Sequence, residues 1–191
     1  MKKPELPIVF FASREEMEMW LEKHHDDSGG IRIRFLKKHV KKPCVAHSDA
    51  IDLALCFGWI DSQVQKGDSD SWLHRFTPRG AKSIWSKRNI EHIARLTKEK
   101  RMRPAGLEEV KKAKKDGRWK QAYDPPSTMK IPEDFLKALS TNKKSAAFFA
   151  TLNRVNLYAI AWRLQTAKKP ETRAKRMNAI LEMLKNNKTF H

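Results

Sequence analysis

The chain has 191 residues and carries 40 Lys and Arg residues against 22 Asp and Glu residues, a formal net charge of +18 at pH 7. Hydrophobic residues make up 40% and charged residues 32% of the sequence. This composition supports a packed core and excludes a disordered basic tail. The length corresponds to one domain or two small ones.

The charge is unevenly distributed along the chain. Residues 1–73 have a net charge of −1, and residues 74–191 have a net charge of +19. Such an excess favours anionic partners. No apolar run approaches the roughly 20 residues of a membrane span, and the apolar run Ile8–Ala12 is too short for a signal peptide. We therefore expect a soluble, cytoplasmic protein with reduced thiols at Cys44 and Cys56.

Two strands and a helix are predicted near the N-terminus. The run Ile8–Phe11 is typical of a strand, and Ser13 followed by Glu16 forms a capping box that begins a helix. Apolar and basic residues alternate over Ile31–Leu36. This period of two predicts a half-buried strand whose arginines share the solvent face.

A second helix and a third strand follow. Ser48 is a candidate N-cap, with Asp49 and Asp52 in the first turn, where carboxylates oppose the positive end of the helix dipole. Gly58 can end this helix. The run Trp72–Thr77 predicts a third strand. We thus expect an α+β fold with a three-stranded antiparallel or mixed sheet packed by helices.

The remaining pattern is helical. Ser83 or Ser86 can cap one basic helix, and Pro104 can begin another. The Pro-rich stretch 123–128 is the best linker, so we place an α+β domain at 1–124 and a helical domain at 131–191. In the latter we expect three or four helices. The last begins at Pro170 and repeats apolar residues at a helical period, at Met177, Ile180, Leu181 and Leu184.

Aromatic and basic residues are interleaved between Trp72 and Arg88. Surfaces for single-stranded nucleic acid need both, because cations bind phosphates and flat rings stack on bases. The rings can instead belong to the core, which is the favoured interpretation for them, whereas the role of the arginines stays open. The residues concerned are Trp72, Arg75, Phe76, Arg79, Lys82, Trp85, Lys87 and Arg88.

A lone carboxylate, Asp61, follows the second predicted helix. It can pair with Arg75 or Arg79 across the sheet, either as part of a small polar site or only to neutralise arginine charge. No second carboxylate or histidine stands at a spacing informative for acid–base chemistry. We therefore assign no catalytic residue.

Signatures of cofactor chemistry are missing from the sequence. Cys44 and His47 have the spacing of zinc ligands, but the further ligands of a finger do not follow. Phosphate-binding loops, dinucleotide fingerprints and nucleophile elbows are also missing. We expect a non-enzymatic protein without metal, ATP or NAD.

The C-terminal basic run spans a helix junction. Arg173 and Arg176 lie near the predicted helix N-terminus, where backbone N–H groups favour a phosphate or carboxylate. A solvated basic face is the alternative.

Five ordered motifs resemble the YdeI/OmpD-associated family, which is labelled bacteriocin-protection. They are Ala54–Ser62, Arg75–Arg79, Ser83–Asn89, Met102–Gly106 and Ala167–Arg176. The resemblance extends over nearly the whole chain and implies a mixed N-terminal part and a helical C-terminal part. If the family shares a pocket, the matching positions are Trp59, Asp61, Arg75, Thr77, Arg79, Ser83, Trp85, Ser86 and Asn89.

We expect an anion-binding protein, with nucleic acid as the favoured anion, linked to stress or antimicrobial-peptide tolerance. Lys87, Arg88, Arg173 and Arg176 complete the set of predicted binding residues. The alternative is a small-ligand protein or enzyme with a cleft around Asp61, Arg79, Ser83 and Asn89. Peripheral membrane attachment is a weaker alternative, because the apolar stripe of the last helix fits a core. Capture of cationic peptides by a +18 protein is disfavoured by repulsion.

Overall fold

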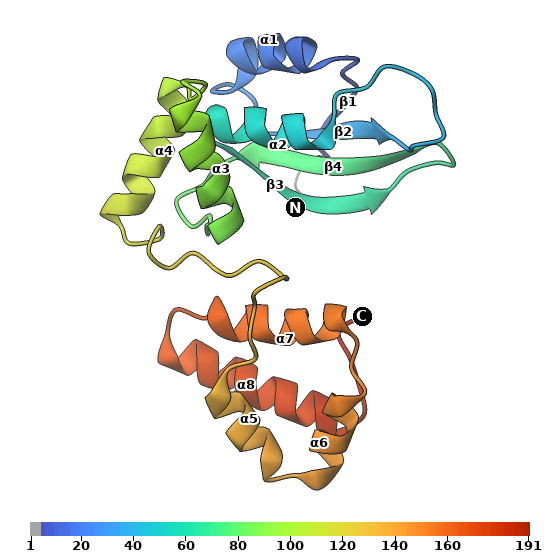
Figure 1. The fold of residues 1–191 in the computed structure, drawn as a ribbon, viewed down its shortest axis with the longest axis vertical. Helices are drawn as coiled ribbons and strands as arrows, with labels where there is room; N and C mark the ends of the chain where they lie inside the picture. The colour runs from blue at the N-terminus through green and yellow to red at the C-terminus, as the bar shows by residue number, and fades with distance from the viewer. Residues whose placement is uncertain (1–4) are drawn as a thin grey trace. The chain divides into compact units, whose positions relative to one another are not determined.

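The computed structural model describes residues 5–191. The chain divides into two compact units, Met1–Gln121 and Ala122–His191 (Figure 1). In chain order the elements of the first unit are β1 (Ile8–Val9), α1 (Arg14–His24), β2 (Ile31–Leu36), α2 (His47–Cys56), β3 (Trp59–Lys66), β4 (Ser71–Pro78), α3 (Lys87–Lys98) and α4 (Pro104–Lys115). Those of the second are α5 (Glu133–Ser140), α6 (Lys143–Ala150), α7 (Arg154–Gln165) and α8 (Pro170–Lys185).

The first unit contains a four-stranded sheet with the strand order β1-β2-β4-β3. Strand β1 runs parallel to β2, and the other pairs are antiparallel, so the sheet is mixed. The prediction of three strands is wrong because it omits β3. Its residues from Ser62 to Lys66 are all exposed, and all of them except Val64 are polar. It therefore lacks the alternation that identifies a strand, and pairing with β4 is what orders it.

The two faces of the sheet differ in character. Helices α1 and α2 lie over one face (Figure 1). Ile31, Ile33 and Phe35 are at most 2% exposed, and full burial of such a side chain contributes about 1.5–3 kcal/mol. Their neighbours Arg32 and Arg34 alternate with them and lie on the other face, as predicted.

Helix α2 differs from its prediction at the N-terminus. It begins at His47 with Ala46 as the N-cap, and Ser48 is not the cap. Asp52 therefore lies in the middle of the helix and is only 5% exposed. Gly58, with φ +76°, ends the helix as expected.

Helices α3 and α4 begin where the caps predict. Ser86 Oγ accepts a hydrogen bond from the Asn89 backbone N–H at 3.0 Å, and Pro104 occupies the first turn of α4. A Cβ atom at Gly106 would lie 2.2 Å from the Cys56 carbonyl oxygen. Only glycine therefore permits this close approach of α4 to the end of α2.

The second unit consists of the four helices α5–α8, and Asn142 caps α6 as predicted. Its core is formed by Phe135, Leu139, Ile160, Leu164, Ile180 and Leu184. Met177 and Leu181 pack against this core, so the stripe of α8 is a core face. Within residues 5–191, no helix combines the length and apolar character that crossing a membrane requires.

Candidate functional site

Three arginines stand on the sheet face turned away from α1 and α2. Arg32 on β2 lies directly opposite Arg75 on β4, and Arg34 follows two residues further along β2. We call Arg32, Arg34 and Arg75 the arginine face. The spacing of opposite residues is about 5 Å between Cβ atoms, and two residues along a strand span about 7 Å. Three guanidinium groups thus share one small surface.

Two of these arginines have carboxylate partners. Arg32 Nη1 lies 2.6 Å from Glu5 Oε1, and its Nε donates to the Leu6 carbonyl oxygen at 3.0 Å. Arg34 Nη1 lies 2.9 Å from Asp68 Oδ2. Within residues 5–191, Arg75 has no ion pair, and its buried Nε has no hydrogen-bond partner. The arginine face therefore has one guanidinium group, that of Arg75, without a carboxylate partner in this part of the chain.

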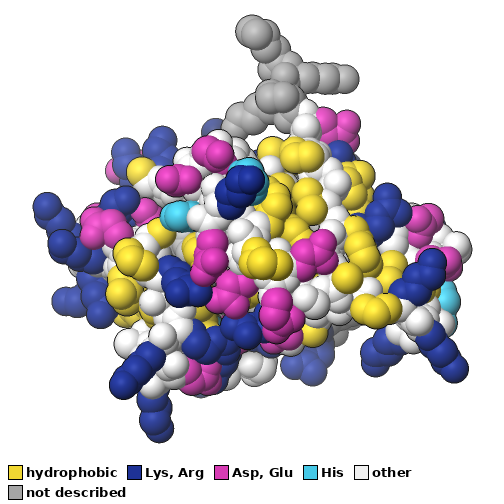
Figure 2. Space-filling model, turned by 90° about the horizontal axis from the view of Figure 1, so that it is seen from above, with side chains coloured by type: hydrophobic (Ala, Val, Ile, Leu, Met, Phe, Trp, Pro, Cys, Tyr) yellow, Lys and Arg dark blue, Asp and Glu magenta, His cyan; other side chains and the backbone are white. Residues whose placement is uncertain are grey.

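Acidic side chains are found on the opposite side of this unit. Viewed from the side of α1, they lie among hydrophobic side chains, with some Lys and Arg side chains interspersed (Figure 2). Helix α1 itself carries Glu15, Glu16, Glu18 and Glu22. The surface over α1 is thus not a basic one.

A chain of three titratable side chains lies on the helix-covered face. His47 Nε2, at the start of α2, is 2.9 Å from His74 Nδ1 on β4. His74 Nε2 is 3.5 Å from Asp61 Oδ2 on β3. Asp61 therefore contacts a histidine. The expected partners from the sequence, Arg75 and Arg79, do not contact it. Side chains alternate between the two faces of the sheet along each strand. Asp61 is opposite Phe76, so its side chain lies on the helix-covered face, whereas that of Arg75 lies on the other face.

Both histidines are held in the neutral form. Burial lowers the pKa of His74, and the nearby His47 lowers it further, whereas Asp61 raises it. Burial also lowers the pKa of His47, with Asp61 opposing and Arg88 reinforcing the shift. Because the two rings hydrogen-bond each other, their facing nitrogens are not available to one metal ion. Within residues 5–191, no group of three metal-ligating side chains is found.

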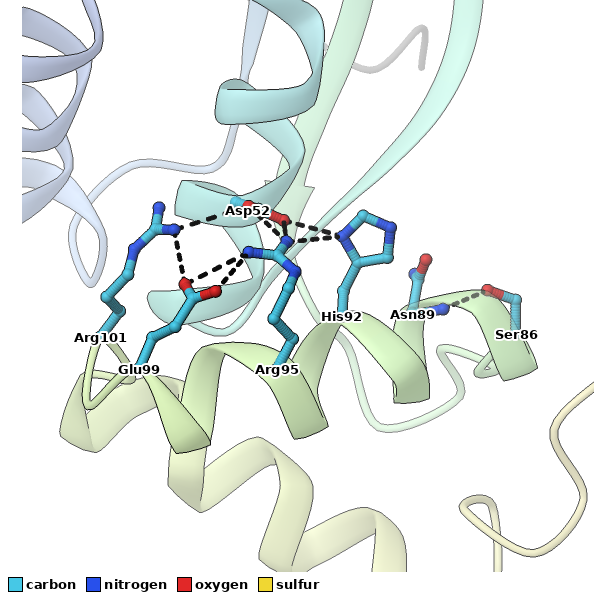
Figure 3. A network of polar contacts seen from close by, with 7 residues as sticks. All are labelled: Asp52, Ser86, Asn89, His92, Arg95, Glu99 and Arg101. Atoms are coloured by element: carbon cyan, nitrogen blue, oxygen red, sulfur yellow. Dashed lines mark hydrogen bonds and ion pairs between the residues drawn. The ribbon is translucent and has the colours of Figure 1, made fainter.

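A second polar network joins α2 to α3 around Asp52 (Figure 3). Asp52 accepts from His92 Nδ1 at 2.7 Å and from Arg95 Nη2 at 2.6 and 2.7 Å. Arg101 Nη1 is 3.8 Å away, and Glu99 pairs with Arg95 and Arg101 at 3.2 and 2.9 Å. Burial raises the pKa of Asp52, but the bonds from Arg95 and His92 outweigh it, and the net shift is downward. Two carboxylates thus match two guanidinium groups.

The predicted tryptophans are core residues. Trp59 and Trp85 are each 1% exposed. Trp59 Nε1 donates to the His25 carbonyl oxygen at 3.0 Å. Trp85 is stacked by Arg79, whose guanidinium carbon lies 3.5 Å from the ring centroid. Trp85 therefore cannot present a stacking surface, whereas Trp72 remains half-buried against Phe35.

The other predicted residues of the first unit serve local structure or lie exposed. Ser83 Oγ accepts from the Gly80 backbone N–H at 3.0 Å, and Arg79 Nη1 donates to the Ile84 carbonyl oxygen at 3.3 Å. Thr77, on the same sheet face as Arg75, packs against Gly30. Lys87 and Arg88 are exposed in the first turn of α3.

The proposed C-terminal anion cradle is already occupied by protein groups. Arg173 forms a bidentate pair with Asp134 of α5. Arg176 Nη1 donates to the Arg163 carbonyl oxygen at 2.7 Å. The two guanidinium groups thus brace α8 against its neighbours.

Cys56 does not have the environment of a nucleophile. Burial raises the pKa of the Cys56 thiol to about 11, which keeps it protonated. Cys44 is also a free thiol.

The first unit is therefore an α+β domain with one helix-covered and one arginine-bearing sheet face, and the second is a four-helix domain. Residues 9–109, just over half of the chain, match the family described as Domain of unknown function (DUF8412), and the chain belongs to that family. Residues 128–187 match the description Bacteriocin-protection, YdeI or OmpD-Associated.

The second match confirms the resemblance stated above over the helical unit. It covers a smaller part of the chain than expected, because four of the five motifs fall within residues 9–109, which match the other family. No curated protein and no solved structure matches the chain.

Proposed function

We propose that the first unit binds a polyanion, with nucleic acid as the expected partner, at the arginine face. The observation that carries the proposal is the direct opposition of Arg75 and Arg32, with no ion pair to Arg75 within residues 5–191. Like charges directly opposite on neighbouring strands are destabilising. A bound phosphate offsets that cost because it supplies the missing negative charge.

Guanidinium groups are well suited to this role. Each presents a rigid fork of N–H donors that binds phosphate oxygens in a bidentate way. The spacing of Arg32, Arg34 and Arg75 allows neighbouring phosphates to be contacted together. Each phosphate neutralised releases counterions, which makes the affinity salt-dependent.

Recognition at this face rests on the backbone of the nucleic acid rather than its bases. Trp85 is buried, and Trp72 belongs to the opposite face together with Phe35. Stacking on the arginine face is therefore not expected, and binding should tolerate changes of sequence. In this proposal the chain is a cytoplasmic binding protein rather than an enzyme.

A role in protection against bacteriocins follows only from the family description of residues 128–187. A net charge of +18 argues against direct capture of cationic peptides. We propose that any protective role is indirect and acts through the bound polyanion during the response of the cell to stress.

The test is fluorescence anisotropy with a labelled single-stranded RNA of mixed sequence, over a series of salt concentrations. Arg75→Gln should weaken binding several-fold and reduce the slope of log K against log salt by about 0.7, the value for one contact to a single strand. Lys98→Gln, an equal change of charge on α3, is the matched control and should act less strongly.

Two results would contradict the proposal. One is the absence of binding to RNA, single-stranded DNA and duplex DNA at about 50 mM salt, where phosphate contacts are strong. The other is an equal loss of affinity and slope in the Arg75 and Lys98 variants, which would indicate a diffuse charge effect instead of a site.

A further inference from the structure

A pocket of about 210 Å³ lies within the second unit. One wall is the segment that precedes α5, with Pro126, Ser127, Met129 and Ile131, and the other is the first half of α7. From α7 the pocket receives Arg154, Leu157 and Tyr158. Its residues are separate from the arginine face, so its role does not depend on the polyanion proposal.

Arg154 differs from the other arginines of this unit. Arg163 donates to the Ala159 carbonyl oxygen and covers the Phe190 ring, and Arg173 and Arg176 are held by the contacts described above. Arg154 is exposed and, among the residues that the structure describes, forms no ion pair or hydrogen bond through its guanidinium group. It is therefore available to a ligand that enters the pocket.

Two hydroxyl groups line the same pocket. Neither the Tyr158 phenol nor the Ser127 hydroxyl has a hydrogen-bond partner within residues 5–191. Burial raises the pKa of Tyr158, and the nearby Tyr123 adds to the shift. The phenol thus remains a neutral O–H donor at pH 7 and adds no negative charge.

The rest of the lining is apolar. Met129, Ile131 and Leu157 form it, together with the Tyr158 ring. A pocket that combines apolar walls with a few convergent polar groups is a usual form of small-molecule site. The volume of about 210 Å³ is below the roughly 300–1,000 Å³ of sites for drug-sized ligands, so the occupant is small.

We propose that this pocket binds a small organic carboxylate with a compact apolar body, such as a short aryl-alkyl acid. The guanidinium group of Arg154 pairs with the carboxylate, the Tyr158 and Ser127 hydroxyls donate to it, and the apolar body lies against Met129, Ile131 and Leu157. Cationic ligands are excluded by Arg154. Inorganic phosphate would leave the apolar lining unused and should bind more weakly.

The experiment is an NMR titration of the ¹⁵N-labelled full chain with 3-phenylpropionate. Amide signals of the residues that line the pocket should shift together and saturate in the millimolar range or below. The uncharged analogue 3-phenylpropan-1-ol, which keeps the ring, and inorganic phosphate, which keeps the charge, should each bind at least several-fold more weakly.

Variants then test the individual contacts. Arg154→Gln should weaken 3-phenylpropionate binding about tenfold or more, since hydrogen bonds to charged groups are the stronger ones. Tyr158→Phe should weaken it several-fold, and Lys143→Gln, an exposed cation at the start of α6, should leave it unchanged. An unaltered pattern of amide signals outside the pocket verifies that each variant is folded.

The proposal is overturned if the lining residues do not shift at about 10 mM 3-phenylpropionate, if the alcohol binds equally well, or if the Lys143 and Arg154 variants weaken binding equally. The polyanion proposal is tested by a separate measurement, RNA binding. RNA binding should be unaffected both by Arg154→Gln and by saturating 3-phenylpropionate, because the residues of the pocket and the arginine face are distinct.

Discussion

Two groups of arginines in the first unit are built differently. Around Asp52, the guanidinium groups of Arg95 and Arg101 are matched by two carboxylates, one of them buried (Figure 3). On the arginine face, three guanidinium groups have two carboxylate partners, and Arg75 has none within residues 5–191. The first group is complete without a ligand. In the function proposed above, a bound anion would supply the charge that the second group lacks.

The largest effect is expected at the centre of the matched group. Asp52→Asn removes the buried charge that Arg95 and His92 bond to and should lower the free energy of unfolding by about 2–4 kcal/mol. The range extends to low values because the side chain of Arg95 is 44% accessible, and water screens its interaction with Asp52. Urea denaturation at pH 7 measures the change.

Asp49→Asn is the matched control, because it makes the same change in the same helix. Asp49 forms no ion pair within residues 5–191, and its loss should cost less than about 1 kcal/mol through the helix dipole. Equal losses in the two variants would show that the Asp52 network contributes nothing specific.

A pH dependence of stability is expected from the same residue. The folded-state pKa of Asp52 is lowered, so its contribution is fully present above the unfolded value of about 3.9 and is lost as the pH falls through the folded value. The free energy of unfolding should therefore fall less steeply below about pH 4 in Asp52→Asn than in the wild type. Parallel pH profiles would contradict this.

The histidine pair should act in a higher pH range. The pKa values of His47 and His74 are lowered on folding, so the unfolded chain binds more protons below about pH 6.5. Stability should fall as the pH decreases from 6.5 through the lowered values, and His74→Gln should reduce this slope. Asp61→Asn should steepen it, because Asp61 raises the pKa of both rings. Denaturation at pH 5 to 8 compares the three proteins.

The smallest effect is expected at Arg75 on the arginine face. Arg75→Gln removes a like charge opposite Arg32, so stability should be unchanged or rise by up to about 0.5 kcal/mol. Arg34→Gln should instead be neutral or slightly destabilising, because it loses the pair with Asp68. A loss of more than about 1 kcal/mol in the Arg75 variant would assign it a structural role and remove the contrast between the two groups.

Local signals predicted much of the fold. The cap at Ser86, the proline at Pro104 and the cap at Asn142 each mark a helix start that the structure confirms. The alternation of β2 correctly separates Ile33 from Arg32 and Arg34. These features depend on neighbours within one turn or one strand, so the sequence is sufficient for them.

The candidate sites were predicted less well. Asp52 was interpreted as a carboxylate of the first turn, because its burial depends on α3 packing beside α2. The partner of Asp61 was missed, because His74 is thirteen positions away and reaches it only through the pairing of β3 with β4. A register shift between Asp61 and Val64 further disturbs the simple alternation.

The sequence by itself determined the charge of the chain, the starts of most helices and the side of β2 that carries its arginines. Only the tertiary structure decided which charges meet. Strand register places Arg75 opposite Arg32, and helix packing brings Arg95 to Asp52. Both depend on contacts between segments far apart in the chain. Such contacts produce no periodic pattern in the sequence from which they could be predicted.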